Sequence, residues 1–362
     1  MTSVSSSAVR LYTLDTLRGL AALCVVFWHW QHFFYVGDDP SLFIASQQPF
    51  FAAFKGLYGH GGLAVQLFFS ISGFVFFWLF ARKISERSIS VKRFALDRFS
   101  RLYPLHIVTF AIVAVLQMVY SSTHSNSFVY QANDAYHAFL NVFLAPAWGF
   151  ESGWSFNAPI WSVSVEVLLY ATFFLICLPG RFLMPFAVLL CLLGGYLYPE
   201  HYKQGSGLLC FYIGGLTYMG LDWLERHAGK ARSSAMLSVA CVAAWVYLLG
   251  FSNSVSTYFV MCVCFPLLIA ALACIGRQWP NLLRSGALLG DISYASYLIH
   301  FPLQILFALT SDRLGFPRTV FYQGWVMLLF FAVLIALSLL SHRFLERPAQ
   351  RFLRRREATP TL

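Results

Sequence analysis

The chain has 362 residues, of which 59% are hydrophobic and only 11% are charged. Soluble domains carry about 25% charged residues, so this composition excludes an ordinary soluble protein and indicates an integral membrane protein. The net charge of +10 would suit a nucleic-acid-binding protein, but the basic residues lie in loops and tails beside apolar segments. Membrane topology accounts for that placement, and we expect no nucleic-acid partner.

Apolar segments long enough to cross a bilayer recur along the chain. We predict an all-α integral membrane protein, a bundle of about ten transmembrane helices with both termini cytoplasmic. The expected spans are 14–35, 58–81, 103–120, 160–178, 182–198, 206–222, 233–250, 256–275, 288–309 and 320–341. With the N-terminus placed inside, 21 of the 25 Lys and Arg residues fall on the cytoplasmic side. This asymmetry agrees with an even number of spans.

Residues 1–350 form a single expected transmembrane domain, and residues 351–362 a basic, disordered cytoplasmic tail. All eight cysteines fall within expected spans, so we predict no disulfide. The sequence has no Cys-x-x-Cys or other His/Cys metal spacing and no His-Glu-x-x-His motif, and we predict no metal site.

The first span carries Arg18 near one end and His29 deep inside. On a helix the step between them rises about 16 Å, roughly half of a hydrocarbon core. Ionisable groups are costly at that depth, which makes His29 a functional candidate. The alternative is a neutral, hydrogen-bonded packing histidine.

The fourth span begins with Trp161, and its residues Ser162, Glu166 and Tyr170 share one helical face. A glutamate this close to an apolar run needs a cation or a hydrogen-bonding cluster. We predict that Glu166 orients His29 or stabilises its protonated form. A structural ion pair is the alternative.

The first inside loop contains Arg98 and Arg101, three residues apart and therefore on one helical face. Guanidinium groups bind phosphate in a bidentate way, so the pair suits a phosphate-rich ligand. A simple excess of positive charge on the cytoplasmic side would also explain them.

In the ninth span, Ser293, Tyr297 and His300 fall on one helical face, which predicts a polar stripe along a cavity or an interhelical seam. His300 is a second catalytic candidate, although the nearby Pro302 also suits a kinked structural site. In the second span, Ser72 lies among small residues that favour close helix packing. The outer loop 121–159 is aromatic and lacks Lys and Arg, so it could be an acceptor-binding lid or a tether.

The chain resembles the acyltransferase-3 family of multispan membrane O-acyltransferases over nearly its whole length. Six motifs carry the resemblance: Arg, ten residues, then His (Arg18, His29); Phe-Phe-x-Ile-Ser-Gly-Phe (Phe68–Phe74); Arg-x-x-Arg-Leu-Tyr-Pro (Arg98–Pro104); Trp-Ser-x-Ser-x-Glu (Trp161–Glu166); Ser-Tyr-x-x-Tyr-Leu-x-His (Ser293–His300); and Glu-Arg-Pro (Glu346–Pro348). One departure is Val167, where the family often has a second acidic residue. It argues against a carboxylate pair there.

The resemblance implies an enzyme that moves an acyl group, usually acetyl, from cytoplasmic acyl-CoA to a hydroxyl of a carbohydrate or related small acceptor. His29 would be the general base or acyl carrier, and Glu166 would orient it. Arg98 and Arg101 would hold the CoA phosphates, and Arg18 would bind the donor or fix the first helix. Supporting or acceptor-side candidates are Ser72, Trp161, Ser162, Ser164, Tyr297 and His300. Acyl-CoA acts as donor substrate, with no bound cofactor.

The bacterial inner membrane is the expected location, and the lipid bilayer is an expected partner. Two other interpretations remain open. One is a multispan transporter or flippase of a lipid-linked sugar or other glycan, which would also keep ionisable groups within its spans. The other is an unrelated multispan acyltransferase that uses His300.

Overall fold

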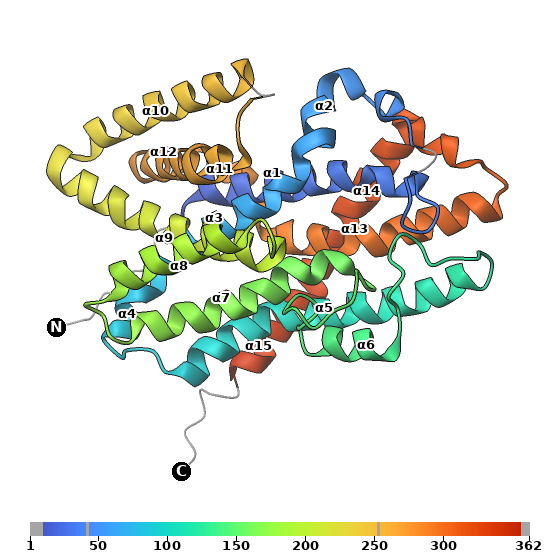
Figure 1. Cartoon of the computed structure of the whole chain (residues 1–362), viewed down its shortest axis with the longest axis horizontal. Helices are drawn as coiled ribbons and strands as arrows, with labels where there is room; N and C mark the ends of the chain where they lie inside the picture. Colours follow the sequence, from blue (N-terminus) through green and yellow to red (C-terminus); the bar gives the residue numbers. More distant parts are fainter. Residues whose placement is uncertain (1–9, 41–42, 252–253, 356–362) are drawn as a thin grey trace, which may run out of the picture. The chain divides into compact units, whose positions relative to one another are not determined.

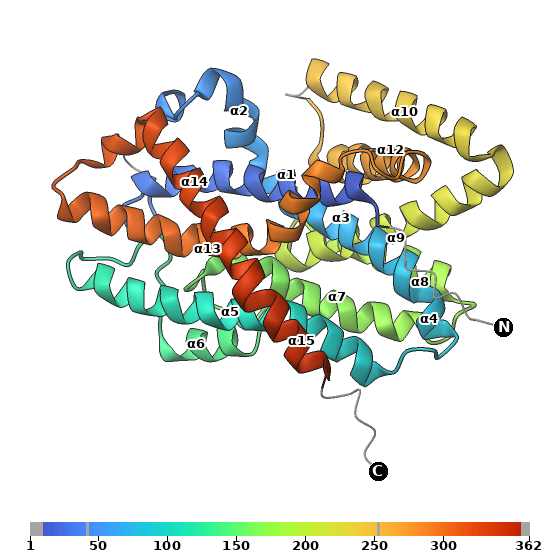
Figure 2. The same cartoon turned by 180° about the vertical axis from the view of Figure 1, so that it is seen from behind.

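The computed structural model describes residues 10–40, 43–251 and 254–355. This part of the chain is helical and contains no β-strand beyond an isolated bridge between Val36 and Asp39, which confirms the predicted all-α class (Figures 1 and 2). Within these residues, seven helical segments are long and apolar enough to cross a membrane, as expected of an integral membrane protein. They are Phe51–Ser85, Val91–Ser121, Ala158–Cys177, Lys230–Gly250, Thr257–Gln278, Arg284–Arg313 and Gly324–Arg355. All eight cysteines are free thiols.

Three further predicted spans are helices that do not reach the same length and apolarity. Helix α1 (Tyr12–His29) has 18 residues and includes two charges near its start. Helix α8 (Leu183–Leu197) has only 15 residues, and α9 (Tyr202–Ala228) ends in a charged stretch. The count of about ten spans and the cytoplasmic termini therefore stay predictions.

The described residues form two compact units. The first unit takes its residues from segments 1–20, 65–90 and 168–291, and the second from 21–64, 91–167 and 292–362. Helices α1, α7 (Trp161–Cys177) and α13 (Ala287–Arg313) contribute residues to both.

In the first unit, α3 (Ala64–Phe76) packs backbone to backbone against α9. A Cβ atom added at Gly73 would lie 1.8 Å from the carbonyl oxygen of Phe211, and one at Gly214 would lie 2.0 Å from that of Ser70. Only glycine allows such an approach, so the packing role expected for the small residues of this span is confirmed at Gly73. The other helices of this unit are α4 (Arg82–Ser85), α8, α10 (Lys230–Gly250), α11 (Thr257–Phe259) and α12 (Phe265–Gln278).

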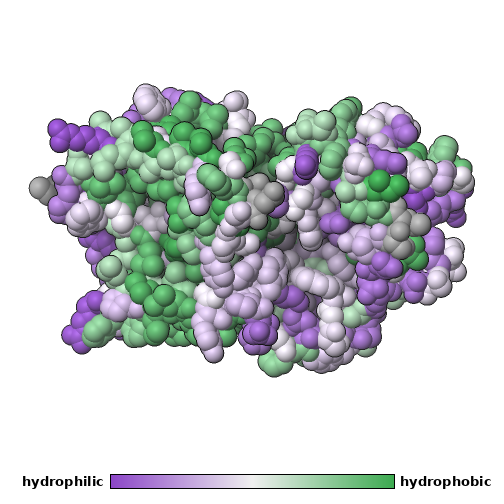
Figure 3. Space-filling model, turned by 45° about the horizontal axis from the view of Figure 1, so that its top comes forward, coloured by the Kyte–Doolittle hydropathy of each residue, from purple (hydrophilic) through white to green (hydrophobic). Residues whose placement is uncertain are grey.

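Helix α10 presents an apolar stripe to its surroundings. Val239, Val242, Val246 and Leu249 recur every three or four residues and are 63–75% exposed. Hydrophobic residues also cover broad areas of the surface in Figure 3. Contiguous apolar surface of this kind is unfavourable in water and suits contact with lipid tails.

The second unit has an aromatic core formed by residues just after α1 and residues near α14 (Gly324–Ser341). The rings of Phe33 and Phe321 stack with centroids 3.9 Å apart, and Phe330 meets both Phe33 and Trp30 edge-on. Trp30 Nε1 donates a hydrogen bond to the Phe321 carbonyl at 2.9 Å. Burying such large rings fixes the 3-10 turn Trp30–Phe34 that follows His29. The other helices here are α2 (Phe51–His60), α5 (Val91–Ser121), α6 (Ala135–Val142) and α15 (Arg347–Arg355).

Helix α15 reaches into the segment predicted as a disordered tail. It continues to Arg355, and Arg354 Nε contacts Asp97 Oδ1 and Ser100 Oγ of α5, each at 3.1 Å. Residues 356–362 lie outside the described part of the chain. The predicted boundary at residue 350 between one transmembrane domain and a tail stays a prediction.

Gly73→Ala should destabilise the protein, because the added methyl group has no room against the Phe211 carbonyl. Overpacking of this kind costs about 1–3 kcal/mol of unfolding free energy. Denaturant titration in detergent micelles would measure it. Gly220→Ala is the matched control, since a Cβ there meets nothing within 4 Å. Equal unfolding midpoints for the two variants would contradict the close approach of α3 and α9.

Candidate functional site

Two of the predicted histidines meet in the second unit. His29 Nδ1 and His300 Nε2 are 2.7 Å apart, which is a hydrogen bond, and the two rings lie nearly parallel. His300 is fully buried and His29 is 7% exposed. The structure therefore brings together the last residue of α1 and the middle of α13, which are 271 residues apart in sequence.

The neighbours of His300 fix which ring nitrogens carry protons. His300 Nδ1 lies 2.6 Å from the carbonyl oxygen of Tyr297, and a carbonyl can only accept. Nδ1 of His300 must therefore carry a proton, and its Nε2 presents a lone pair when the ring is neutral. That lone pair accepts from His29 Nδ1–H, which leaves a lone pair on His29 Nε2. The geometry thus prepares His29 Nε2 to take a proton or to attack a carbonyl carbon.

Residues from the start of α7 brace Tyr297. The Tyr297 hydroxyl donates to the Pro159 carbonyl at 2.7 Å, and the Ser162 hydroxyl lies 2.9 Å from the Tyr297 hydroxyl and 3.4 Å from the same carbonyl. Asn157 Nδ2 donates to the carbonyl of Leu298 at 3.0 Å. Ser162 and Tyr297, both predicted as supporting residues, therefore hold the backbone that orients His300.

His32 and Gln304 complete this cluster, and neither was predicted from the sequence. Gln304 Nε2 donates to the His29 carbonyl at 2.8 Å, and its Oε1 lies 3.3 Å from His32 Nδ1. The His32 ring stacks on His29 with centroids 4.6 Å apart. Helical spacing could have suggested them, because His32 follows His29 by three residues and Gln304 follows His300 by four.

Glu166 lies half-buried in α7. The hydrogen bond that orients the His29 ring comes from His300. An orienting role for Glu166 stays a prediction, and the structure offers His300 for that role.

Two other predicted residues of α7 hold the outer loop. Ser164 Oγ accepts from the backbone N–H of Ala147 at 3.2 Å, and its carbonyl accepts from Trp148 Nε1 at 3.0 Å. Trp161 meets Trp154 edge-on, with centroids 6.3 Å apart. The loop of residues 121–159 is therefore folded against α7, the helix that supports Tyr297.

Ser72, the remaining supporting candidate, lies half-buried in α3 of the first unit.

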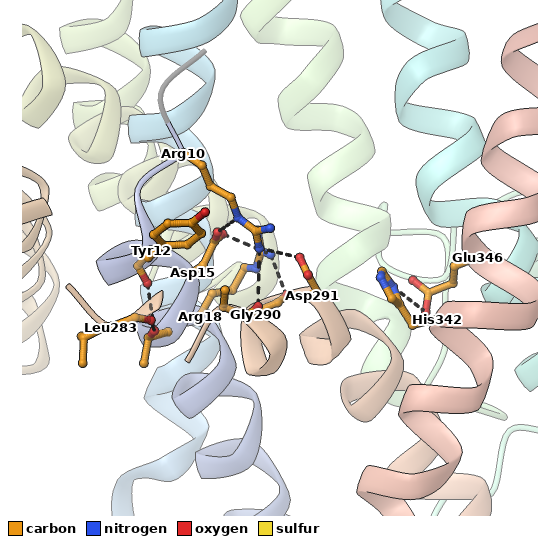
Figure 4. A network of polar contacts seen from close by, with 11 residues as sticks. Arg10, Tyr12, Asp15, Arg18, Leu283, Gly290, Asp291, His342 and Glu346 are labelled. Atoms are coloured by element: carbon orange, nitrogen blue, oxygen red, sulfur yellow. Dashed lines mark hydrogen bonds and ion pairs between the residues drawn. The ribbon is translucent and has the colours of Figure 1, made fainter. Parts of the chain in front are cut away.

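Arg18 belongs to an ion-pair network in the first unit (Figure 4). Its guanidinium donates to the Gly290 carbonyl at 2.6 Å and lies 3.6 Å from Asp15. Arg10 bridges Asp15 and Asp291 at 2.5 and 2.6 Å. These contacts tie the start of α1 to the start of α13. Donor binding by Arg18 stays a prediction.

Arg98 and Arg101 both lie half-buried in α5. The positive charge of Arg101 acts on the carboxylate of Glu346, which is 4% exposed and 3.8 Å from His342 Nδ1 (Figure 4). Glu346 opens the Glu-Arg-Pro motif, so that motif places a buried carboxyl group beside one of the two predicted phosphate ligands.

The comparisons with known proteins decide the family. Residues 11–341 match the family model for an acyltransferase domain. The chain belongs to the acyltransferase-3 family. This confirms the resemblance stated from the six motifs and makes the protein a membrane acyltransferase.

Two curated proteins are similar to this chain, over different shares of its length. Acyltransferase MdmB of Streptomyces mycarofaciens is 29% identical over 399 aligned positions, which cover 98% of this chain and 95% of that protein. Protein 2 in picA locus of Rhizobium radiobacter is 36% identical over 105 residues, which cover 29% of this chain and 44% of that protein. No solved structure gives a significant match to this acyltransferase.

His300→Leu should destabilise the acyltransferase more than His300→Gln. Leucine leaves the buried N–H of His29 and the carbonyl of Tyr297 without their partner, which costs about 1–3 kcal/mol. The glutamine side chain keeps an oxygen that can accept from His29. Unfolding titrations of both variants would measure the difference. Equal stability of His300→Leu and the parent protein would contradict the hydrogen bond.

Proposed function

We propose that this protein is a membrane O-acyltransferase that moves an acyl group, acetyl in the first instance, from cytoplasmic acyl-CoA to a hydroxyl of a carbohydrate or related acceptor. The observation that carries this proposal is the hydrogen-bonded sequence from the Tyr297 carbonyl through His300 to His29. Family membership favours acyl transfer over transport of a glycan.

His29 would act through Nε2. In direct transfer, Nε2 removes the proton of the acceptor hydroxyl while the oxygen attacks the thioester carbonyl. The C–S bond breaks, the new ester C–O bond remains, and the CoA thiolate takes the proton from the imidazolium. In the two-step version Nε2 itself attacks the thioester carbonyl and carries the acyl group, and the CoA thiolate leaves as the C–S bond breaks. The acceptor hydroxyl then attacks the acyl-imidazole, the N–C bond breaks, and the hydroxyl proton goes to the thiolate. Both routes begin from the same lone pair.

His300 is a positioning residue in this scheme. When His29 becomes an imidazolium or an acyl-imidazole, the proton on its Nδ1 bears more positive charge. The lone pair of His300 Nε2, 2.7 Å away, then accepts a stronger hydrogen bond. This stabilises the transition state more than the ground state, which is the requirement for acceleration.

The donor would be held by Arg98 and Arg101, whose guanidinium groups suit the phosphates of CoA. Acyl-CoA supplies an activated thioester. The excess of Lys and Arg in the loops assigned to the cytoplasm supports a donor that enters from that side and the bacterial inner membrane as the location.

The acceptor would enter on the opposite side, where the loop of residues 121–159 is assigned. Its Trp148 and Trp154 are held near the start of α7 by Ser164 and Trp161. Aromatic faces suit sugar rings and other partly apolar acceptors. Ser162 and Tyr297 would keep the histidine pair in place beneath it.

His29→Ala should abolish acyl transfer while leaving acyl-CoA binding intact. Loss of a general base lowers the rate by about 10²–10⁴-fold, and loss of an acyl carrier lowers it further. Radiolabelled acetyl-CoA and the purified protein in nanodiscs provide both readouts. His227→Ala is the matched control, because His227 is exposed on α9 and its ring bonds only to its own helix. A fully active His29→Ala protein would refute the assignment.

The double variant Arg98→Ala/Arg101→Ala should weaken acetyl-CoA binding and raise the KM for acetyl-CoA. The thermal stability of the protein should change little. The double variant Arg82→Ala/Lys92→Ala removes the same charge from exposed positions and serves as control. Binding measured at several salt concentrations separates a phosphate site from general attraction. Equal binding by the two double variants would place the donor elsewhere.

A further inference from the structure

The outer loop contains a second histidine with a fixed tautomer. Asp134 caps the N-terminus of α6, and its Oδ1 accepts from both the backbone N–H and the ring Nδ1 of His137, each at 2.8 Å. The His137 side chain is only 2% exposed. On its other side, His137 Nε2 lies 3.1 Å from the hydroxyl of Ser152 and also accepts from the backbone N–H of Ser152 at 3.3 Å.

The chemistry of these three groups follows from their proton positions. A carboxylate only accepts, so Nδ1 of His137 carries a proton and Nε2 presents a lone pair to the Ser152 hydroxyl. Two hydrogen bonds from His137 hold the pKa of Asp134 below its usual range, and the bond from the backbone N–H has the larger effect. Asp134 is therefore ionised at neutral pH. A nucleophile, a base and an acidic orienting group thus stand in the order used for nucleophilic catalysis by serine.

The loop is braced around this contact. The Tyr136 hydroxyl donates to the Phe150 carbonyl at 3.0 Å, and the Ala132 N–H donates to the Trp154 carbonyl at 3.3 Å. Both contacts join the segment around α6 to the segment that carries Ser152. The serine is therefore positioned from both sides and is still exposed to a substrate.

Exposed aromatic side chains accompany the serine. Tyr136, Phe139, Phe150 and Trp154 are between 41% and 64% exposed, and all lie within 20 residues of sequence around it. Large exposed rings in one loop favour binding of an apolar or ring-bearing group. The polar chemistry of the serine and the apolar character of its surroundings together suit an ester of a hydrophobic or cyclic alcohol.

We propose that Ser152, His137 and Asp134 form a second acyl-transfer centre, which cleaves oxygen esters independently of acyl-CoA. Ser152 Oγ attacks the ester carbonyl, and its proton passes to His137 Nε2 and then to the departing alkoxide as the ester C–O bond breaks. The serine then carries the acyl group as an ester. Water attacks this ester, gives a proton to His137, and releases the carboxylic acid as the proton returns to Ser152.

This activity is separate from the proposed transfer at His29. It needs no thioester, and its residues all lie in the outer loop. The two proposals therefore fail separately. His29→Ala should leave ester cleavage unchanged, and Ser152→Ala should leave acetyl-CoA binding unchanged.

The test uses the full-length protein in nanodiscs with two probes. A fluorophosphonate, followed by peptide mapping, reports an activated serine, and hydrolysis of p-nitrophenyl acetate reports turnover. The parent protein and the His29→Ala variant should both be labelled at Ser152. His137→Gln should lower labelling and hydrolysis by about 10²–10⁴-fold, because no base remains. Asp134→Asn should lower both less, with recovery in Asp134→Glu if the carboxylate positions the ring.

Two controls make the outcome decisive. Ser152→Ala replaces an exposed side chain, so it should fold normally and lose both signals. Ser122→Ala removes another exposed loop serine, whose hydroxyl bonds only to the Val119 carbonyl, and should keep both signals. A parent protein that is not labelled at Ser152, or hydrolysis that survives in Ser152→Ala, would overturn the proposal.

Discussion

The hydrogen bond between His29 and His300 is the contact on which the candidate site depends. Two neutral imidazoles cannot bond through two lone pairs, so one nitrogen of the pair must carry the proton. The carbonyl of Tyr297 decides which one, because it accepts the other proton of His300. Everything that holds Tyr297, including Ser162 and the turn at Pro159, therefore acts on the reactivity of His29. A backbone carbonyl performs this task without a buried charge, which would be costly within a membrane.

The outer loop solves the same orientation problem with a different group. There Asp134, a carboxylate, fixes the tautomer of His137. Asp134 is largely exposed to solvent, so water still solvates its charge. The contrast follows from the surroundings, since an uncharged acceptor suits the buried pair and an ionised one suits the loop. The ion pairs of Arg10 with Asp15 and Asp291 have a structural role, since they hold the starts of two helices together.

Hydropathy predicted most of the fold, because long apolar segments have few alternatives to helix in a bilayer. Helical spacing and membrane depth likewise singled out His29 and His300 one by one. Their contact could not be predicted, because residues 271 apart give no local signal of which helices meet. The sequence suggested Glu166 as the group that orients His29, and that role stays a prediction; the hydrogen bond of His29 Nδ1 to His300 was not predicted. The contact between His137 and Ser152 lies in a loop without periodicity, so spacing could not indicate it.

The most direct test of the account is nitrogen NMR of the protein in lipid with isotope-labelled histidine. The bond predicts a through-hydrogen-bond coupling between a protonated Nδ1 of His29 and an unprotonated Nε2 of His300. The two coupled nitrogen signals are assigned to His29 and His300 because the coupling is lost in His29→Gln and in His300→Gln. A His29 ring that is protonated at Nε2, or that shows no coupling to His300, would contradict the claim that this contact prepares His29 for acyl transfer.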